Sequence, residues 1–224
     1  MHTGSTTTLR HHGDPLTVTA VAHRGEPVGH RENTLPAFAA AGALGADMVE
    51  LDLRRTRDDE IVVLHDQTLD RLWGVSRSVG DLDLAQVQGV GDGDVGIPTF
   101  REVLAAVPLA LMVDFTRREV VMGALQAAVE AGALEDHSPG ARIGLTWVEG
   151  PEPPLTLLRA LGAEYWNPMS GLVTPEGVAA VHGEGLKVST WTVDEPPDMQ
   201  RVVDAGVDAV VSNRVADLVA FLRS

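Results

Sequence analysis

The 224-residue chain contains no cysteine, and positive charge is scarce in it. Without cysteine it can form neither disulfide bonds nor thiolate metal sites, which fits a reducing compartment. Its 17 lysines and arginines stand against 32 aspartates and glutamates, a formal net charge of −15. Nucleic-acid and anionic-membrane binding rely on lysine and arginine, so we expect neither kind of partner. An anionic substrate would need local attraction, from a metal ion or a few arginines.

Long apolar runs are missing as well. The longest uncharged apolar run that we find, Val103–Val113, is too short to span a bilayer and contains Pro108. The first residues lack the apolar stretch of a signal peptide. We therefore expect a cytoplasmic protein without stable membrane insertion, in which residues 1–16 form a mobile tail.

Three sequence motifs of common enzyme classes are also absent. No Gly-x-Gly-x-x-Gly follows the first apolar run, which counts against a dinucleotide-binding fold. No P-loop and no Gly-x-Ser-x-Gly is present, so NTPase and serine-hydrolase functions lack support.

Short β-branched runs alternate with longer amphipathic runs along the chain. Uniformly apolar strands separated by helices are typical of a parallel sheet covered on both faces. With no dinucleotide motif, the pattern favours an α/β fold of the TIM-like (β/α) barrel type over a doubly wound sheet. Seven parallel strands are predicted, near residues 18–23, 47–53, 109–114, 141–146, 163–167, 187–191 and 208–212. An eighth is missing or hidden around residues 115–140, so the barrel would be abbreviated or irregular.

Helix signals lie between these strands. Thr34 and Thr174 are suitable caps, and the prolines that follow them, Pro36 and Pro175, are tolerated in a first turn. Residues 66–98 do not fit a strand–helix unit, which indicates a short insertion after the second strand. We expect one barrel domain over residues 17–224 that includes this insertion.

Acidic residues lie near the ends of two predicted strands, where the active residues of a barrel are found. Glu50 and Asp52 are two positions apart in a strand and therefore point the same way. Two such carboxylates repel unless a cation lies between them, and a hard divalent ion, Mg²⁺ or Ca²⁺, prefers oxygen ligands. Asp114 could supply a third oxygen. The alternative is that Glu50 and Asp52 face solvent or a salt bridge; the apolar flanks and Asp114 favour the metal.

Two histidines follow apolar runs, and each precedes a charged residue. His23 is followed by Arg24 and His65 by Asp66, which suggests an acid and a base. Arg24 offers a planar fork for a phosphate, and it could also pair with Glu50 or Glu32. A metal, two histidines and an arginine suit phosphodiester hydrolysis.

These residues occur in segments that resemble the glycerophosphodiester phosphodiesterases from about Val18 onward. The segments are "AHRG", "ENTLPAF", "VELDLRRTRDDEIVVLHDQTLDR", "IPTFREVL", "TWTVD" and "DAVVSNR". The resemblance implies a TIM-like barrel with a small insertion, a divalent cation, and hydrolysis of glycerophosphodiesters to an alcohol and glycerol 3-phosphate.

The resemblance also implies a role for each site residue. His23 and His65 would be the acid–base pair, and Arg24 would hold phosphate. Glu50 and Asp52 would ligate the metal, together with Asp114. Supporting residues would be Glu32 and Asn33 of the Glu-Asn-Thr motif, and Trp191 would line the substrate cleft.

The chain departs from the family pattern in three ways: in the third-strand motif, in a shorter middle of the chain that agrees with the missing strand, and in the charged pair His30-Arg31 before Glu-Asn-Thr. "DFT" stands where the family usually has a motif like "EIK", so Asp114 replaces a glutamate and Thr116 a lysine. Arg117 or Arg118 could substitute for that lysine, and so could His30 or Arg31 of the first loop. The simplest interpretation of His30 and Arg31 is a solvated pair. Two alternatives follow: a phospholipase D-like enzyme acting on lysophospholipid head groups, or a phosphate-ester-binding barrel with little turnover.

Overall fold

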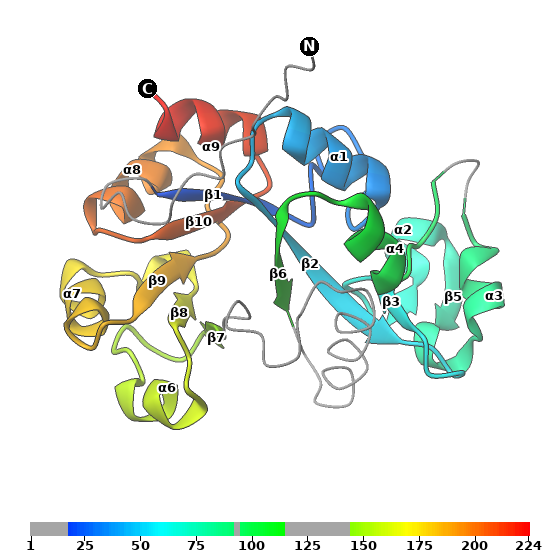
Figure 1. The fold of residues 1–224 in the computed structure, drawn as a ribbon, viewed down its shortest axis with the longest axis horizontal. Helices are drawn as coiled ribbons and strands as arrows, with labels where there is room; N and C mark the ends of the chain where they lie inside the picture. Colours follow the sequence, from blue (N-terminus) through cyan, green and yellow to red (C-terminus); the bar gives the residue numbers. More distant parts are fainter. Residues whose placement is uncertain (1–17, 92–94, 115–143) are drawn as a thin grey trace, which may run out of the picture.

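A curved sheet of seven parallel strands forms the centre of this computed structural model (Figure 1). The structure describes residues 18–91, 95–114 and 144–224. The strands follow one another across the sheet in the order β6 (Ala110–Asp114), β2 (Met48–Arg55), β1 (Thr19–His23), β10 (Ala209–Ser212), β9 (Lys187–Thr190), β8 (Tyr165–Pro168) and β7 (Gly144–Trp147). All seven predicted strands are therefore present, and the sheet curves as in an irregular α/β barrel. The region of the predicted eighth strand lies outside the described residues.

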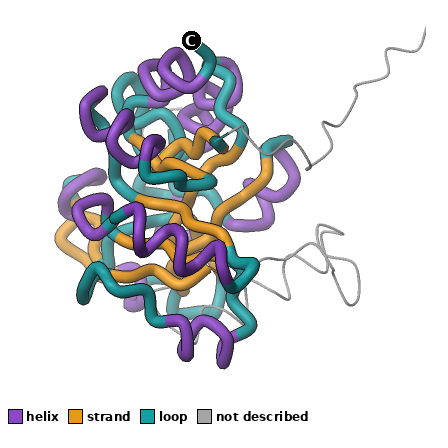
Figure 2. Tube along the Cα trace, turned by 90° about the vertical axis from the view of Figure 1, so that its left-hand side faces the viewer, coloured by secondary structure: helices purple, strands orange, loops and turns teal. Residues whose placement is uncertain are grey.

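Helices surround the curved sheet on its outer side (Figures 1 and 2). They are α1 (Leu35–Ala43), α4 (Phe100–Ala106), α6 (Leu155–Leu161), α7 (Pro175–Gly183), α8 (Pro196–Asp204) and α9 (Val215–Leu222). The predicted threonine caps are confirmed. The hydroxyl oxygens of Thr34 and Thr174 accept hydrogen bonds from the backbone N–H of the third residue of α1 and of α7. None of the helices in the described ranges is long and apolar enough to cross a membrane.

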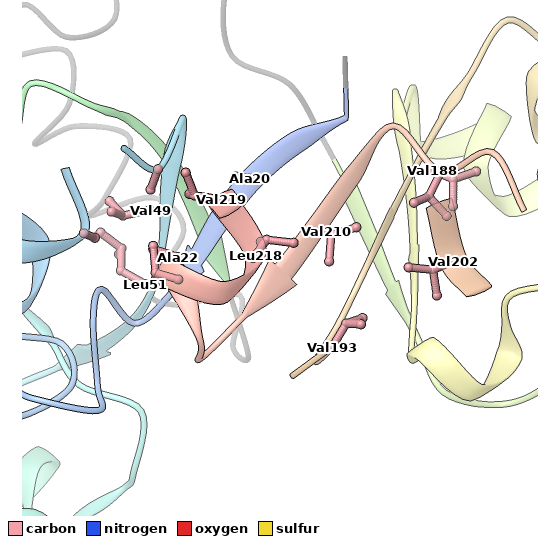
Figure 3. Close-up of a cluster of buried hydrophobic side chains, with 14 of the residues drawn as sticks. Ala20, Ala22, Val49, Leu51, Val188, Val193, Val202, Val210, Leu218 and Val219 are labelled. Atoms are coloured by element: carbon pink, nitrogen blue, oxygen red, sulfur yellow. The ribbon is translucent and has the colours of Figure 1, made fainter. Parts of the chain in front are cut away.

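Alternation along the strands gives the sheet two different faces. On the outer face, small and branched side chains of the strands, among them Ala20, Ala22, Val49, Leu51 and Val210, share one apolar cluster with Leu218 and Val219 of α9 (Figure 3). A separate inner cluster contains Val21, Ala209 and Val211, with Met48, Met112 and Trp191 packed against it. Because successive strand side chains point to opposite faces, the residues two positions beyond Val21, Met48 and Met112 also face inward. Those residues are His23, Glu50 and Asp114.

A small subdomain follows β2, where the sequence predicted an insertion. The strand β3 (Ile61–Val63) runs antiparallel to the end of β2. Beyond it lie β4 (Thr68–Leu69), α2 (Asp70–Trp73), β5 (Val75–Ser78), η1 (Val79–Asp81) and α3 (Leu84–Gln88), and β4 pairs with β5 in a separate two-stranded sheet. The segment has its own apolar cluster, which includes Leu64, Leu69, Val79 and Val87. It therefore packs as a unit beside the main sheet.

The turn after β1 depends on two successive residues in the left-handed conformation. Arg24 has φ +58° and Gly25 has φ +86°. A Cβ atom on Gly25 would lie 2.7 Å from the carbonyl carbon of Ala37 in α1, far inside van der Waals contact. Only glycine therefore satisfies both the backbone angle and the close approach of the turn to α1.

We expect Gly25→Ala to lower the free energy of unfolding by about 2–4 kcal/mol, combining left-handed strain and overpacking. Gly162 is a matched control, because it has φ +61° but nothing within 4 Å of an added Cβ. Gly162→Ala should cost only about 1–2 kcal/mol, the strain alone. Urea denaturation of both variants measures the difference, and equal losses would contradict the close-approach argument.

Candidate active site

Three carboxylates meet on the inner face of the sheet. Glu50 and Asp52 come from β2 and Asp114 from β6, where Asp52 and Asp114 are register partners. One oxygen from each lies within 4.8 Å of the others. Glu50 and Asp52 are almost fully buried, with 7% and 2% of their surface exposed. The structure thus brings together the three predicted metal ligands.

The electrostatics of this cluster favour a bound cation. Burial raises the pKa of Glu50 well above its ordinary value, and the nearby charges of Asp52 and Asp114 raise it further, while Arg24 opposes them. An all-carboxylate set of oxygen donors suits a hard divalent ion such as Mg²⁺ or Ca²⁺, which would relieve the repulsion. The residues present therefore fit a divalent metal.

His23 is held in one orientation by a chain of hydrogen bonds. Its Nδ1 lies 2.7 Å from Oδ1 of Asn213, while the Asn213 amide nitrogen donates to Asp194 at 2.8 Å. Asp194 also accepts the backbone N–H of Asn213 at 2.8 Å. The Asp194 carboxylate only accepts hydrogen bonds, so the Asn213 amide nitrogen faces Asp194 and its amide oxygen faces His23. Because that oxygen is also an acceptor, Nδ1 of His23 must carry the proton. In the neutral ring Nε2 is then an unprotonated acceptor, 3.9 Å from Oε2 of Glu50.

Burial, followed by the charge of Arg24, lowers the pKa of His23 below its ordinary value. The hydrogen bond that His23 donates to Asn213 and the nearby carboxylates oppose this shift without reversing it. At neutral pH His23 is therefore a neutral imidazole that can take up a proton at Nε2.

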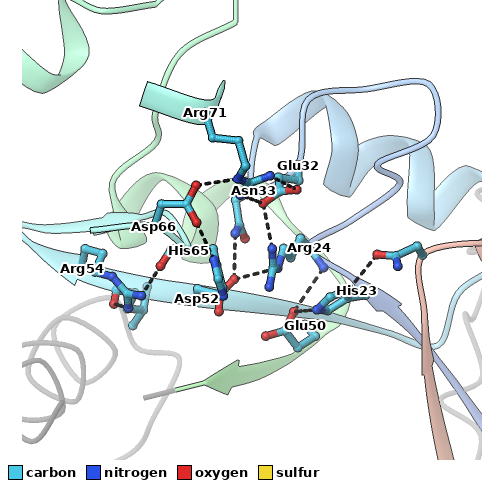
Figure 4. A network of polar contacts seen from close by, with 12 residues as sticks. His23, Arg24, Glu32, Asn33, Glu50, Asp52, Arg54, His65, Asp66 and Arg71 are labelled. Atoms are coloured by element: carbon cyan, nitrogen blue, oxygen red, sulfur yellow. Dashed lines mark hydrogen bonds and ion pairs between the residues drawn. The ribbon is translucent and has the colours of Figure 1, made fainter. Parts of the chain in front are cut away.

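Arg24 lies beside the acidic cluster and is oriented by carboxylates (Figure 4). Its Nη1 donates to Glu32 at 2.9 Å, and its Nε lies 3.2 Å from Oδ2 of Asp52. Of the two alternative partners considered from the sequence, Glu32 forms the side-chain ion pair. Glu50 instead accepts the backbone N–H of Arg24, at 3.2 Å. The buried amide of Asn33 donates to the same Asp52 oxygen at 2.9 Å, which holds the first loop against β2.

His65 approaches the same network from the insertion side (Figure 4). Its Nδ1 lies 2.7 Å from Oδ1 of Asp66, so Nδ1 carries the proton here too. Oδ2 of Asp66 accepts from Nε of Arg71 at 2.6 Å. Asp66 stays ionised because hydrogen bonds from Arg71 and His65 lower its pKa despite partial burial.

The remaining predicted residues lie around this network. Trp191 follows β9 in the inner apolar cluster, and its indole N–H donates to the backbone oxygen of Asn167 at 3.1 Å. In the first loop, His30 pairs with Glu26 at 3.0 Å, and the guanidinium of Arg31 lies 4.3 Å from the centre of the Trp73 ring. Thr116, Arg117 and Arg118 lie outside the described residues.

Sequence reasoning assigned no role to Asn213, Asp194 or Arg71. Asn213 closes the last predicted strand, so its position was a signal, but its contact with His23 spans 190 residues. Asp194 and Arg71 lie within the motifs "TWTVD" and "TLDR". Their partners are distant in sequence, and only the folded chain identifies them.

A family model described as the Glycerophosphoryl diester phosphodiesterase family matches residues 23–122 and 135–217. The chain belongs to this family. The resemblance inferred from its motifs is thereby confirmed, and so is the predicted enzyme class, a hydrolase of phosphoric diester bonds.

Individual members of this family are similar to the chain over most of its length. A glycerophosphodiester phosphodiesterase from Caldanaerobacter subterraneus is 28% identical over 91% of this chain and 97% of its own. A probable glycerophosphodiester phosphodiesterase from Mycobacterium tuberculosis is 30% identical over 94% and 90%. The solved structure of an Oleispira antarctica phosphodiesterase in complex with the product sn-glycerol-3-phosphate matches with a TM-score of 0.82, at 19% identity, over 93% and 98% of the two chains. The predicted irregular TIM-like barrel is confirmed.

The raised pKa of Glu50 gives a stability prediction for the metal-free protein. An acid whose pKa is higher in the folded than in the unfolded state makes stability fall as pH rises between those two values. At pH 8, Glu50→Gln should therefore raise the free energy of unfolding of chelator-treated protein by about 1–2 kcal/mol.

This advantage should disappear near pH 4, where Glu50 is protonated in both states. Added Mg²⁺ or Ca²⁺ should stabilise the unsubstituted protein more than the variant. Thermal unfolding at both pH values, with and without metal, tests this; a variant less stable than the parent in chelator at pH 8 would refute it.

Proposed function

We propose that this chain is a metal-dependent phosphodiesterase that hydrolyses glycerophosphodiesters to an alcohol and sn-glycerol 3-phosphate. The observation that supports it most is the convergence of a three-carboxylate cluster from β2 and β6, Arg24 and His23 at the end of β1, and His65 just after β3. Family membership supports the same reaction and a small-molecule substrate. The formal net charge of −15 is what supports the expectation that nucleic acid is not a partner.

Glu50, Asp52 and Asp114 would hold the divalent cation. When bound, Mg²⁺ or Ca²⁺ neutralises phosphate charge and stabilises the charge that develops on the phosphoryl oxygens. Arg24 would bind a phosphate oxygen next to the cation, because Glu32 and Asp52 fix its guanidinium beside the carboxylate cluster. Glu32 and Asn33 would act by supporting this arrangement, and Trp191 would line the cleft.

The two histidines have different surroundings, and we assign them different roles. His23 is partly buried and neutral with an unprotonated Nε2, which suits a base that takes a proton from the attacking nucleophile. His65 is more exposed, and the Asp66 carboxylate balances the charge of a ring protonated on both nitrogens. That ring suits an acid that delivers its Nε2 proton to the leaving alkoxide as the phosphorus–oxygen bond breaks.

A substrate panel with and without chelator tests the proposal. We expect EDTA to abolish release of sn-glycerol 3-phosphate from glycerophosphocholine, glycerophosphoethanolamine or glycerophosphoinositol, and added Mg²⁺ or Ca²⁺ to restore it. His23→Ala and His65→Ala should each reduce kcat by at least about 100-fold, the lower range for a lost acid or base.

Four results would contradict parts of this assignment. Activity that is indifferent to chelator, or unchanged in His23→Ala, would refute the mechanism. Turnover of lysophospholipids with none of the glycerophosphodiesters would identify the phospholipase D-like alternative. Tight binding of phosphate esters without product would identify the barrel with little turnover.

Asn213→Ala should lower kcat by about 10–100-fold with little effect on KM, because it frees the His23 ring without touching the phosphate side. Ser212→Ala is a matched control, since the Ser212 hydroxyl donates to Oδ1 of the same Asp194, whose Oδ2 accepts from the Asn213 amide, and Ser212 forms no hydrogen bond with His23. Steady-state kinetics of both variants check this. Equal losses in both would show that the effect comes from Asp194 and the loop rather than from the His23 orientation.

A further inference from the structure

The short helix α2 of the insertion contacts the loop that follows β1. Arg71, at its second position, donates from Nη2 to Oε1 of Glu32 at 2.6 Å and from Nη1 to Oε2 at 3.1 Å. The same guanidinium donates from Nε to Asp66 at 2.6 Å. One side chain therefore spans two carboxylates that are 34 positions apart in the sequence.

Each of these carboxylates has a second partner in the active site. Oε1 of Glu32 also accepts from Nη1 of Arg24 at 2.9 Å. The other oxygen of Asp66, Oδ1, lies 2.7 Å from Nδ1 of His65. Arg71 is thus linked to Arg24 through Glu32. It is linked to His65 through Asp66 (Figure 4).

We infer that Arg71 is a positioning residue that couples the two halves of the active site, fixing Arg24 through Glu32 and His65 through Asp66. The inference rests on the proposed function for the roles of Arg24 and His65. No contact of Arg71 with the carboxylate cluster is present among the described residues, so its effect would pass through Glu32 and Asp66.

The chemistry of the arginine fork explains why this residue type stands here. Its planar guanidinium can meet the two Glu32 oxygens with two nitrogens while the third nitrogen reaches Asp66. A lysine has a single nitrogen and could not hold both carboxylates in fixed planes. Without a cation between them the carboxylates would repel, and each would lose the orientation that it passes on.

A second contact of α2 separates docking from positioning. Trp73, at the end of the helix, packs under the guanidinium of Arg31 in the same loop, 4.3 Å from the ring centre. This contact also joins the insertion to the loop, but it involves neither Glu32 nor Asp66. Substitution of either Trp73 or Arg71 should weaken the contact between the insertion and the first loop. Only substitution of Arg71 should disturb the orientation of Arg24 and His65.

The test compares Arg71→Met with two controls in the full-length protein. Arg57→Met removes another arginine of the insertion region, which pairs with Asp83 through two nitrogens at 2.9 and 2.5 Å, away from both histidines. Trp73→Leu removes the stack on Arg31. We expect Arg71→Met to reduce kcat/KM by about 10–100-fold, as displaced supporting groups do, and both controls to stay near the parent value.

Two further readouts distinguish positioning from a general loss of structure. If Arg71 acts through its partners, the losses in Glu32→Gln/Arg71→Met and Asp66→Asn/Arg71→Met should be much smaller than the product of the single losses. At alkaline pH, where the His65 ring is neutral, its ¹⁵N resonances should shift from the Nδ1–H form toward a mixture of tautomers in Arg71→Met and remain unchanged in both controls. If Arg71→Met fails to fold, Arg71→Lys takes its place, with an intermediate loss expected.

Parent-like kinetics in Arg71→Met, multiplicative losses in the double variants, or equal effects of Trp73→Leu would each overturn the inference. If the unsubstituted protein hydrolyses no member of the panel, the proposed function fails. The His65 resonances then decide on Arg71 alone, and an unchanged Nδ1–H form in Arg71→Met would reject its role.

Discussion

The repulsion among the three inward-facing carboxylates is the constraint on which the rest of the active site depends. Glu50 and Asp52 are buried in a sheet whose other inward residues are largely apolar, and burial raises the pKa of Glu50 well above its ordinary value. Such a cluster is stable only if positive charge or hydrogen-bond donors surround it. Arg24 and Asn33 supply part of this compensation through Asp52, and the donor set fits a divalent cation for the remainder.

This requirement extends outward through successive partners. Arg24 needs Glu32 to hold its guanidinium, Glu32 is in turn held by Arg71, and Arg71 reaches Asp66 beside His65. On the other side, Asp194 orients Asn213, which orients His23. Through these contacts, both the short insertion and the loop after the last strand help to orient the charged groups around the carboxylate cluster. The pairs nearest the cluster are the most buried, so we expect solvent screening to weaken them least.

Much of the fold could be predicted because its signals are local. Apolar runs marked all seven parallel strands of the main sheet, threonine caps marked the starts of two helices, and the irregular stretch after β2 marked the insertion. Alternation within a strand also placed Glu50 and Asp52 on one face. The partners that orient the histidines could not be predicted, because no local pattern links His23 to Asn213 or Glu32 to Arg71.

The sequence by itself determined the barrel type, the family and the candidate site residues, because strand periodicity and motif order are properties of the chain alone. The tertiary structure decided how those residues are oriented. It fixed the ring nitrogen that carries the proton in each histidine, paired Arg24 with Glu32 and Asp52, and placed Arg31 over Trp73. These features depend on contacts between segments far apart in the chain, and a hydrogen bond acquires its direction only when both partners are held in place.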